Sequence, residues 1–192
     1  NTPHSILFLG EHIYKYNLKE QTFSTATEQE GQDIIGALLP IGNYQEHTYL
    51  SDTKHIYELD NRTNRLKALY SCQKDTIINS VSRDEEGNFW IGNNYGLVHY
   101  SPSTKTKTPI PTSLFGEITL IVCDQQGKVW IGADSMLFAW LIKEKKFVLF
   151  GESDGVILNE YLSKPQLLSM QGEVYMGGVK GLLHINSNLP LT

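Results

Sequence analysis

The sequence has little cysteine and no concentration of positive charge. Its two cysteines, Cys72 and Cys123, are too few for a disulfide scaffold and stand in no metal-ligand spacing. Lys and Arg together number 16, the net charge is −5, and no long basic run occurs. We therefore expect no surface that binds the phosphate backbone of a nucleic acid. We also predict no cofactor and no metal, and leave the redox state of the two thiols open.

Long apolar runs are missing as well. No stretch approaches the roughly 18 apolar residues that a membrane-spanning helix requires, and no helical periodicity is evident. Residues 1–4 show neither an initiator Met nor a signal pattern, so we interpret the chain as a mature or excised segment, with membrane attachment only through downstream regions. The chain has instead 10 Tyr, 7 Phe and 16 Gly, which favours strands and tight turns.

One motif recurs about every 40 residues along the chain. Its clearest copies are Asp84–Gly92 and Asp124–Gly132, each of the form Asp-x-x-Gly-x-x-Trp-Ile-Gly. A third copy ends in Val174–Gly177, and an eroded one lies at Thr48–Leu59. In all four, seven residues separate the aromatic side chain from the first apolar residue of the following strand. These pairs are Tyr49 and Ile56, Trp90 and Leu97, Trp130 and Leu137, and Tyr175 and Leu182.

Each part of the motif has a physical interpretation. The Asp side chain can accept backbone N–H groups in a hairpin turn, Gly tolerates positive φ, and the last Gly permits close backbone approach. Four strands in about 40 residues are typical of a propeller blade. We predict an all-β fold, a β-propeller of four-stranded antiparallel blades. The positions assigned this structural role are Asp84, Gly87, Trp90, Gly92, Asp124, Gly127, Trp130, Gly132, Tyr175 and Gly177.

The approximate repeats are 1–30, 31–73, 74–113, 114–152 and 153–192. The first enters at its second strand and the last ends after its third, which leaves about four to five blades. An open ring would expose apolar faces and strand edges to water. We therefore expect either that the chain is part of a larger propeller, paired with the remaining blades, or that it completes itself with a second copy.

The candidate ligand contacts lie in loops at one end of the blades. Turns between second and third strands lie on the same face as the connections between blades, and rigid scaffolds carry binding residues on such loops. Amide, carboxylate, ammonium and phenol groups gathered there suit a hydroxyl-rich ligand such as an oligosaccharide. A solvated turn remains the simpler interpretation of any single residue. The residues are Asn93, Asn94, Tyr95, Asp134, Ser135, Glu160 and Lys180.

Other chemical groups have simpler structural interpretations. Trp90 and Trp130 occupy equivalent positions, so we interpret them as core between blades and not as sugar-stacking platforms. His99 and His184 also share a repeat position, but equivalent residues of different blades lie too far apart to share a metal. The Asp-x-x-Gly turns lack the closely spaced oxygen ligands and the distal Glu of a calcium-binding loop. No nucleophile and base form a recognisable constellation, so no catalytic residue is predicted.

The motif, followed by Gly-Leu, resembles the two-component regulator propeller repeat. That repeat builds the periplasmic sensors of hybrid two-component histidine kinases in Bacteroides-type bacteria. Asp154–Tyr161 and Val174–Leu182 resemble the closing blade of the C-terminal propeller in those sensors. The resemblance covers roughly residues 45–186. The sequence departs from the family pattern in the first two repeats. It also departs in the last repeat, where Ser169 replaces the turn Asp and Tyr175 replaces the Trp.

The resemblance implies a non-catalytic periplasmic sensor segment. Such sensors detect glycan fragments and relay a conformational signal through an immunoglobulin-like domain and a membrane helix to a histidine kinase. Two alternatives remain open from the residues. One is a propeller enzyme similar to streptogramin lyase, with His99 or His184 as metal ligand. The other is a protein-docking scaffold.

Overall fold

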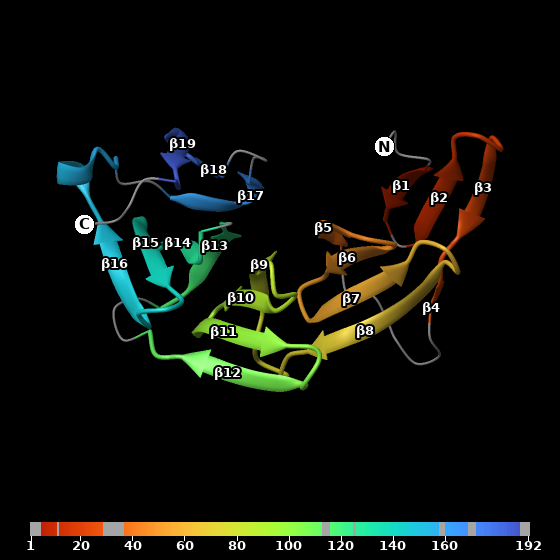
Figure 1. Ribbon diagram of the computed structural model, residues 1–192, viewed down its shortest axis with the longest axis horizontal. Helices are drawn as coiled ribbons and strands as arrows, with labels where there is room; N and C mark the ends of the chain where they lie inside the picture. The colour runs from red at the N-terminus through yellow and green to blue at the C-terminus, as the bar shows by residue number, and fades with distance from the viewer. Residues whose placement is uncertain are drawn as a thin grey trace. The chain divides into compact units, whose positions relative to one another are not determined.

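The computed structural model describes residues 5–10, 12–28, 37–112, 116–124, 126–157, 160–168 and 172–188, with backbone alone at 27–28 and 163–168. These residues form β-strands and one short 3₁₀ turn, and no α-helix occurs among them. The strands make five sheets, in which every pairing but one is antiparallel (Figure 1). The chain divides into two compact units, residues 1–75 and 76–192.

The first unit contains two sheets. One has the order β1-β2-β3, and the other has the order β4-β8-β7-β6-β5, in which the short β4 pairs parallel with β8. The strands are β1 (Ser5–Leu9), β2 (Ile13–Asn17), β3 (Thr22–Thr25), β4 (Thr27–Glu28), β5 (Leu39–Tyr44), β6 (His47–Ser51), β7 (His55–Asp60) and β8 (Arg65–Ser71).

The second unit contains three sheets of consecutive strands, β9–β12, β13–β16 and β17–β19. The first strands of the three sheets, β9, β13 and β17, contact one another in turn. The elements are β9 (Ile78–Arg83), β10 (Phe89–Asn93), β11 (Gly96–Ser101), β12 (Thr106–Ile110), β13 (Ile118–Cys123), β14 (Lys128–Ala133), β15 (Met136–Leu141), β16 (Lys146–Phe150), the 3₁₀ turn η1 (Glu152–Asp154), β17 (Tyr161–Leu168), β18 (Glu173–Gly178) and β19 (Gly181–Asn186).

In the two four-stranded sheets β9–β12 and β13–β16, the fourth strand is the most exposed. In β13 every residue except Thr119 is buried, whereas β12 is exposed except at Ile110. Sheets of four sequential antiparallel strands, joined through buried first strands and exposed at the fourth, are propeller blades. The structure thus confirms the all-β propeller prediction, while the five repeat boundaries stay a prediction.

The strand register is the same in four of the sheets. In each antiparallel pair, the aromatic residue of the second strand lies opposite the residue two positions after the apolar residue that ends the seven-residue interval. These cross-strand pairs are Tyr49 with Glu58, Trp90 with His99, Trp130 with Ala139, and Tyr175 with His184. The fixed interval in the sequence therefore reflects a fixed hairpin geometry.

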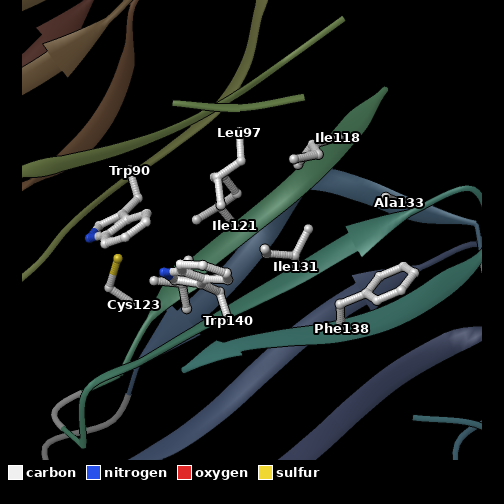
Figure 2. Close-up of a cluster of buried hydrophobic side chains, with 10 residues drawn as sticks. Trp90, Leu97, Ile118, Ile121, Cys123, Ile131, Ala133, Phe138 and Trp140 are labelled. Carbon is white, nitrogen blue, oxygen red and sulfur yellow. The ribbon is translucent and has the colours of Figure 1, made fainter. Parts of the chain in front are cut away.

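The core of the second unit lies between its sheets. Trp90 and Leu97 of one sheet pack against Ile118, Ile121 and Phe138 of the next, all of them buried (Figure 2). A second cluster, which includes Trp130, Val174 and Met176, joins the next two sheets. Full burial of one such side chain contributes about 1.5–3 kcal/mol, so these faces supply much of the unit's stability.

The glycine that ends the motif lies against the following sheet. A Cβ added at Gly92 would stand 2.5 Å from Cγ2 of Ile118, and one at Gly132 would stand 2.6 Å from Cβ of Tyr161. Both distances are shorter than any tolerable carbon contact, so neighbouring sheets approach at these positions because a side chain is absent.

Candidate functional site

The turn aspartates bind the indoles of their own sheets. Asp84 accepts Nε1–H of Trp90 at 2.9 Å and the backbone N–H of Asn88 at 2.8 Å. Asp124 accepts Nε1–H of Trp130 at 3.0 Å and the backbone N–H of Lys128 at 2.8 Å. Each carboxylate therefore fixes both the turn between the first two strands and the rim of the core between sheets.

The junction between sheets β13–β16 and β17–β19 is closed by polar contacts. The hydroxyl of Ser187, just after β19, donates to Oδ2 of Asp124 and lies 3.4 Å from Nε1 of Trp130. Lys128 adds Nζ at 3.6 Å from the same carboxylate oxygen and donates to the carbonyl of Ser187 at 2.7 Å. The Asp124 side chain is consequently inaccessible to solvent.

The preceding junction lacks a counterpart of the Ser187 hydroxyl. Counting from Gly132 and Gly177, which hold the same register, the counterpart of Ser187 is Ile142. Ile142 packs against the Trp90 core cluster and carries no hydroxyl to donate to Asp84. The Asp84 side chain retains 12% exposure, so this junction leaves its carboxylate accessible where the next one caps it.

A groove of about 840 Å³ lies at this open junction. Its walls are the Asp84–Glu86 turn with Trp90 and His99 on one side, residues 108–111 along β12, and Trp140, Ile142, Lys143 and Lys145 on the other side. The groove thus combines carboxylates, an imidazole, ammonium groups and an apolar strip. Figure 2 shows the indoles of Trp90 and Trp140 on the same side of the buried cluster, beside Cys123.

Two rings line the inner part of the groove, close to a buried thiol. His99 contacts Trp90 in a tilted arrangement with ring centroids 4.5 Å apart, and its Nε2 lies 3.9 Å from Oδ2 of Asp84. Burial raises the pKa of the Cys123 thiol, with the nearby Asp84 and Asp124 acting in the same direction. The Cys123 thiol therefore stays uncharged within the buried cluster beside the groove.

The loop residues predicted from sequence lie at the other end of the strands. Asn93 is buried and accepts the backbone N–H of Tyr95 at 2.7 Å, while Asn94 accepts that of Ile77 at 2.8 Å. The Tyr95 side chain is 67% exposed. Of this group Tyr95 is thus the residue best placed to meet a ligand, and the two amides hold the turn.

The remaining loop residues fall into two places. Asp134 and Ser135 form the β14–β15 turn with positive φ at both, and Asp134 accepts the backbone N–H of Gly116 at 3.2 Å. The backbone N–H of Val179 donates to the carbonyl of Glu160 at 3.0 Å. This bond brings Glu160 beside the turn that carries the exposed Lys180, so these two predicted residues are neighbours.

Sequence reasoning missed the groove because its residues are not conspicuous as a motif. A signal was nevertheless available in the repeat itself: Ile142 stands where the last repeat has Ser187. Among the described residues, no three His, Cys, Asp or Glu side chains form a group suited to a metal ion.

No helix in the described part of the chain is long and apolar enough to span a membrane.

No protein-family model matches the sequence, and no curated protein matches it. Solved structures match by fold. The extracellular domain of BT3049, assigned as a hybrid two-component system of B. thetaiotaomicron, has a TM-score of 0.68 and 16% identity over 98% of this chain and 28% of its own. That of BT4673, assigned likewise in the same organism, has a TM-score of 0.67 and 18% identity over 98% of this chain and 26% of its own.

The WD40 repeats of RRP9 match with a TM-score of 0.59 and 9% identity, over 77% of this chain and 47% of that one. These similarities establish the propeller fold. The chain spans about a quarter of the length of the two B. thetaiotaomicron domains.

Proposed function

We propose that this chain is a segment of a non-catalytic sensor domain that lies outside the cytoplasm in a two-component signalling protein. Two observations that agree with each other support the proposal. The sequence bears a repeat that resembles the regulator propeller repeat, and the fold matches extracellular domains assigned to two-component systems over 98% of the chain. The resemblance further supports a periplasmic location and a signal relayed to a histidine kinase.

In this proposal, glycan fragments contact the loop end of the blades. Tyr95 offers an exposed ring, and Glu160 with Lys180 offers a carboxylate and an ammonium group on adjoining segments. A rigid scaffold that carries polar groups and an aromatic ring on its loops suits a hydroxyl-rich ligand. Ligand contact with several loops would couple their positions and supply the conformational signal.

The same proposal includes further blades on the open sheet faces. Leu7, Leu9 and Ile13 of sheet β1–β3 pack into the core of the first unit. The opposite face of this sheet is apolar and exposed, in contrast with the corresponding face of β14 and β15, which is buried against the preceding sheet. The exposed residues are Ile6 (45%), Phe8 (49%), Tyr14 (42%) and Phe23 (66%).

The last sheet, β17–β19, has an exposed face on the side where a following sheet would pack. Leu182 is 62% exposed, whereas its counterpart Leu137 is 1% exposed because sheet β17–β19 covers it. We propose that each open face binds a blade of the same repeat. The exposed apolar faces also favour the docking-scaffold alternative, in which a different protein occupies them.

The test is thermal unfolding of the intact ectodomain against a broad panel of oligosaccharides. We expect one class to raise Tm and the double variant Tyr95→Ala, Lys180→Ala to lose that rise, with no product formed on prolonged incubation. No rise with any member of the panel would argue strongly for the docking alternative.

The enzyme alternative requires a metal centre built from His and an acid. His99 lies tilted against Trp90, and His184 stacks on Tyr175, each within its own sheet, with ring centroids 4.5 and 4.7 Å apart. A metal bound by either histidine, detected by elemental analysis of the purified ectodomain, would reverse the non-catalytic assignment.

A further inference from the structure

The open junction between sheets β9–β12 and β13–β16 holds two polar atoms at a distinctive separation. Oδ2 of Asp84 and Nε2 of His99 stand 3.9 Å apart, too far for a hydrogen bond between them. An oxygen atom set to one side of the line that joins them can lie about 2.8 Å from each, which is within hydrogen-bond distance of both. A hydroxyl there donates to the carboxylate and accepts from Nε2–H.

The next junction of the same chain contains a hydroxyl in a comparable environment. At the next junction the Ser187 hydroxyl donates to Asp124 and lies 3.4 Å from Nε1 of Trp130. The first junction has the same Asp and indole but Ile142 in place of the serine. A hydroxyl is therefore the group that this carboxylate–indole pair binds elsewhere in the same fold, and the 12% exposure of the Asp84 side chain leaves its carboxylate accessible to an external one.

The walls of the groove indicate what carries the hydroxyl. Pro109, Ile110 and Pro111 form an apolar strip along β12 that faces the polar end of the groove. Glu85 and Glu86 on one rim stand against Lys143 and Lys145 on the other. The two Glu and two Lys side chains offset one another, and Asp84 leaves one carboxylate in excess. The groove therefore disfavours an anionic ligand and favours one with an apolar face and hydroxyls that can donate to a carboxylate.

We propose that this groove is a second saccharide site, in which a ring hydroxyl bridges Asp84 and His99 and the ring face lies on the β12 strip. The site lies at the opposite end of the strands from the Tyr95 and Lys180 loops. The choice of a saccharide rests in part on the proposed sensor function, whereas the hydroxyl position rests on the Asp84–His99 separation and on the analogy with Ser187.

The experiment follows the indole N–H signals of the 192-residue chain by two-dimensional NMR. The probes are neutral di- and trisaccharides of glucose, galactose, mannose, xylose and arabinose, with uronic-acid disaccharides and an arginine-rich hexapeptide as charged comparisons. Tryptophan-to-phenylalanine variants assign Trp90, Trp130 and Trp140. We expect a neutral sugar to shift the Trp90 signal saturably and leave that of Trp130 in place, because Ser187 already caps the second pair.

Two variants test the hydroxyl position. Ile142→Ser installs the internal hydroxyl beside Asp84 and is expected to weaken sugar binding at least tenfold. His99→Phe keeps a ring on Trp90 but removes Nε2, and is expected to weaken binding by about tenfold, the loss of one hydrogen bond. The matched control Leu149→Ser replaces a 55% exposed residue on β16 and should leave affinity unchanged.

The outcomes separate this site from the sensor proposal. Saturable Trp90 shifts that both variants weaken support the groove. Shifts of the backbone N–H signals of Tyr95 and Lys180 in the same spectra, with the Trp90 indole signal unmoved, would overturn the groove and leave the sensor proposal intact. Shifts of Trp90 with the charged probes alone would overturn the saccharide assignment, and unchanged affinity in Ile142→Ser and His99→Phe would overturn the bridging hydroxyl.

Discussion

The indole N–H of Trp130 donates to the buried carboxylate of Asp124 at 3.0 Å, and Trp90 makes the same bond to Asp84 at 2.9 Å. Six positions separate donor and acceptor in both cases. The motif therefore needs its Asp and its Trp together, because one carboxylate organises the turn and also satisfies the indole at the edge of the core.

Replacement of the buried aspartate tests this arrangement. Asp124→Ala leaves the indole N–H of Trp130 and the hydroxyl of Ser187 without their acceptor, and also leaves the ammonium group of Lys128 without its carboxylate. We expect a loss of about 3–5 kcal/mol in the free energy of unfolding, measured with urea. The exposed control Glu144→Ala should change stability by less than about 0.5 kcal/mol. Similar values for the two variants would show that the carboxylate network is not stabilising.

Close approach at the motif glycine gives a second prediction. Gly132→Ala places a methyl 2.6 Å from Tyr161, so the sheets must separate or Tyr161 must move. We expect destabilisation of about 1–3 kcal/mol by overpacking, measured by urea unfolding. Gly116→Ala is the matched control because its Cβ meets nothing within 4 Å. Equal stability of the two variants would contradict the close approach.

The two cysteines should differ in reactivity. Burial raises the pKa of the Cys123 thiol, so the thiolate that reacts with alkylating agents is scarce. Cys72 is only partly buried. We expect iodoacetamide to label Cys72 first under native conditions and Cys123 only on unfolding, as followed by intact mass. In Cys72→Ser, rapid native labelling would mean that the junction around Cys123 opens readily.

The exposed turn at Asp60 predicts a small acid dependence. Backbone N–H groups of Thr63 and Arg62 lower the pKa of Asp60 below its ordinary 3.8. A carboxyl with a lowered pKa in the folded state stabilises the fold above its unfolded pKa, and this stabilisation is lost as the pH falls through the folded value. Asp60→Asn should therefore flatten the fall in Tm below about pH 4. An unchanged acid profile would contradict the assignment.

Much of the fold could be predicted because the repeat encodes local geometry. The aromatic-to-apolar interval fixes the hairpin between the second and third strands, and four sheets share its register. The short parallel strand β4 carries no comparable pattern, because its pairing with β8 depends on contacts between distant parts of the chain.

The candidate sites were less predictable for a physical reason. Polar residues in loops can be listed from sequence, but whether an amide holds its turn, as Asn93 does, depends on backbone geometry. The groove depends on which side chain of one sheet meets Asp84 of another. That relation involves residues 58 positions apart, Asp84 and Ile142, and becomes visible only when the repeats are placed in register.

The open faces of the first and last sheets provide the most direct test of the claim that this chain is a run of blades from a larger ring. Light scattering of the 192-residue chain over a range of concentrations measures it. We predict an average mass above 21.7 kDa that rises with concentration. At a given concentration, the average mass should be lower for Phe8→Asp and Leu182→Asp and unchanged for the turn control Thr104→Asp. A monodisperse 21.7 kDa monomer at every concentration, unaltered by these substitutions, would contradict it.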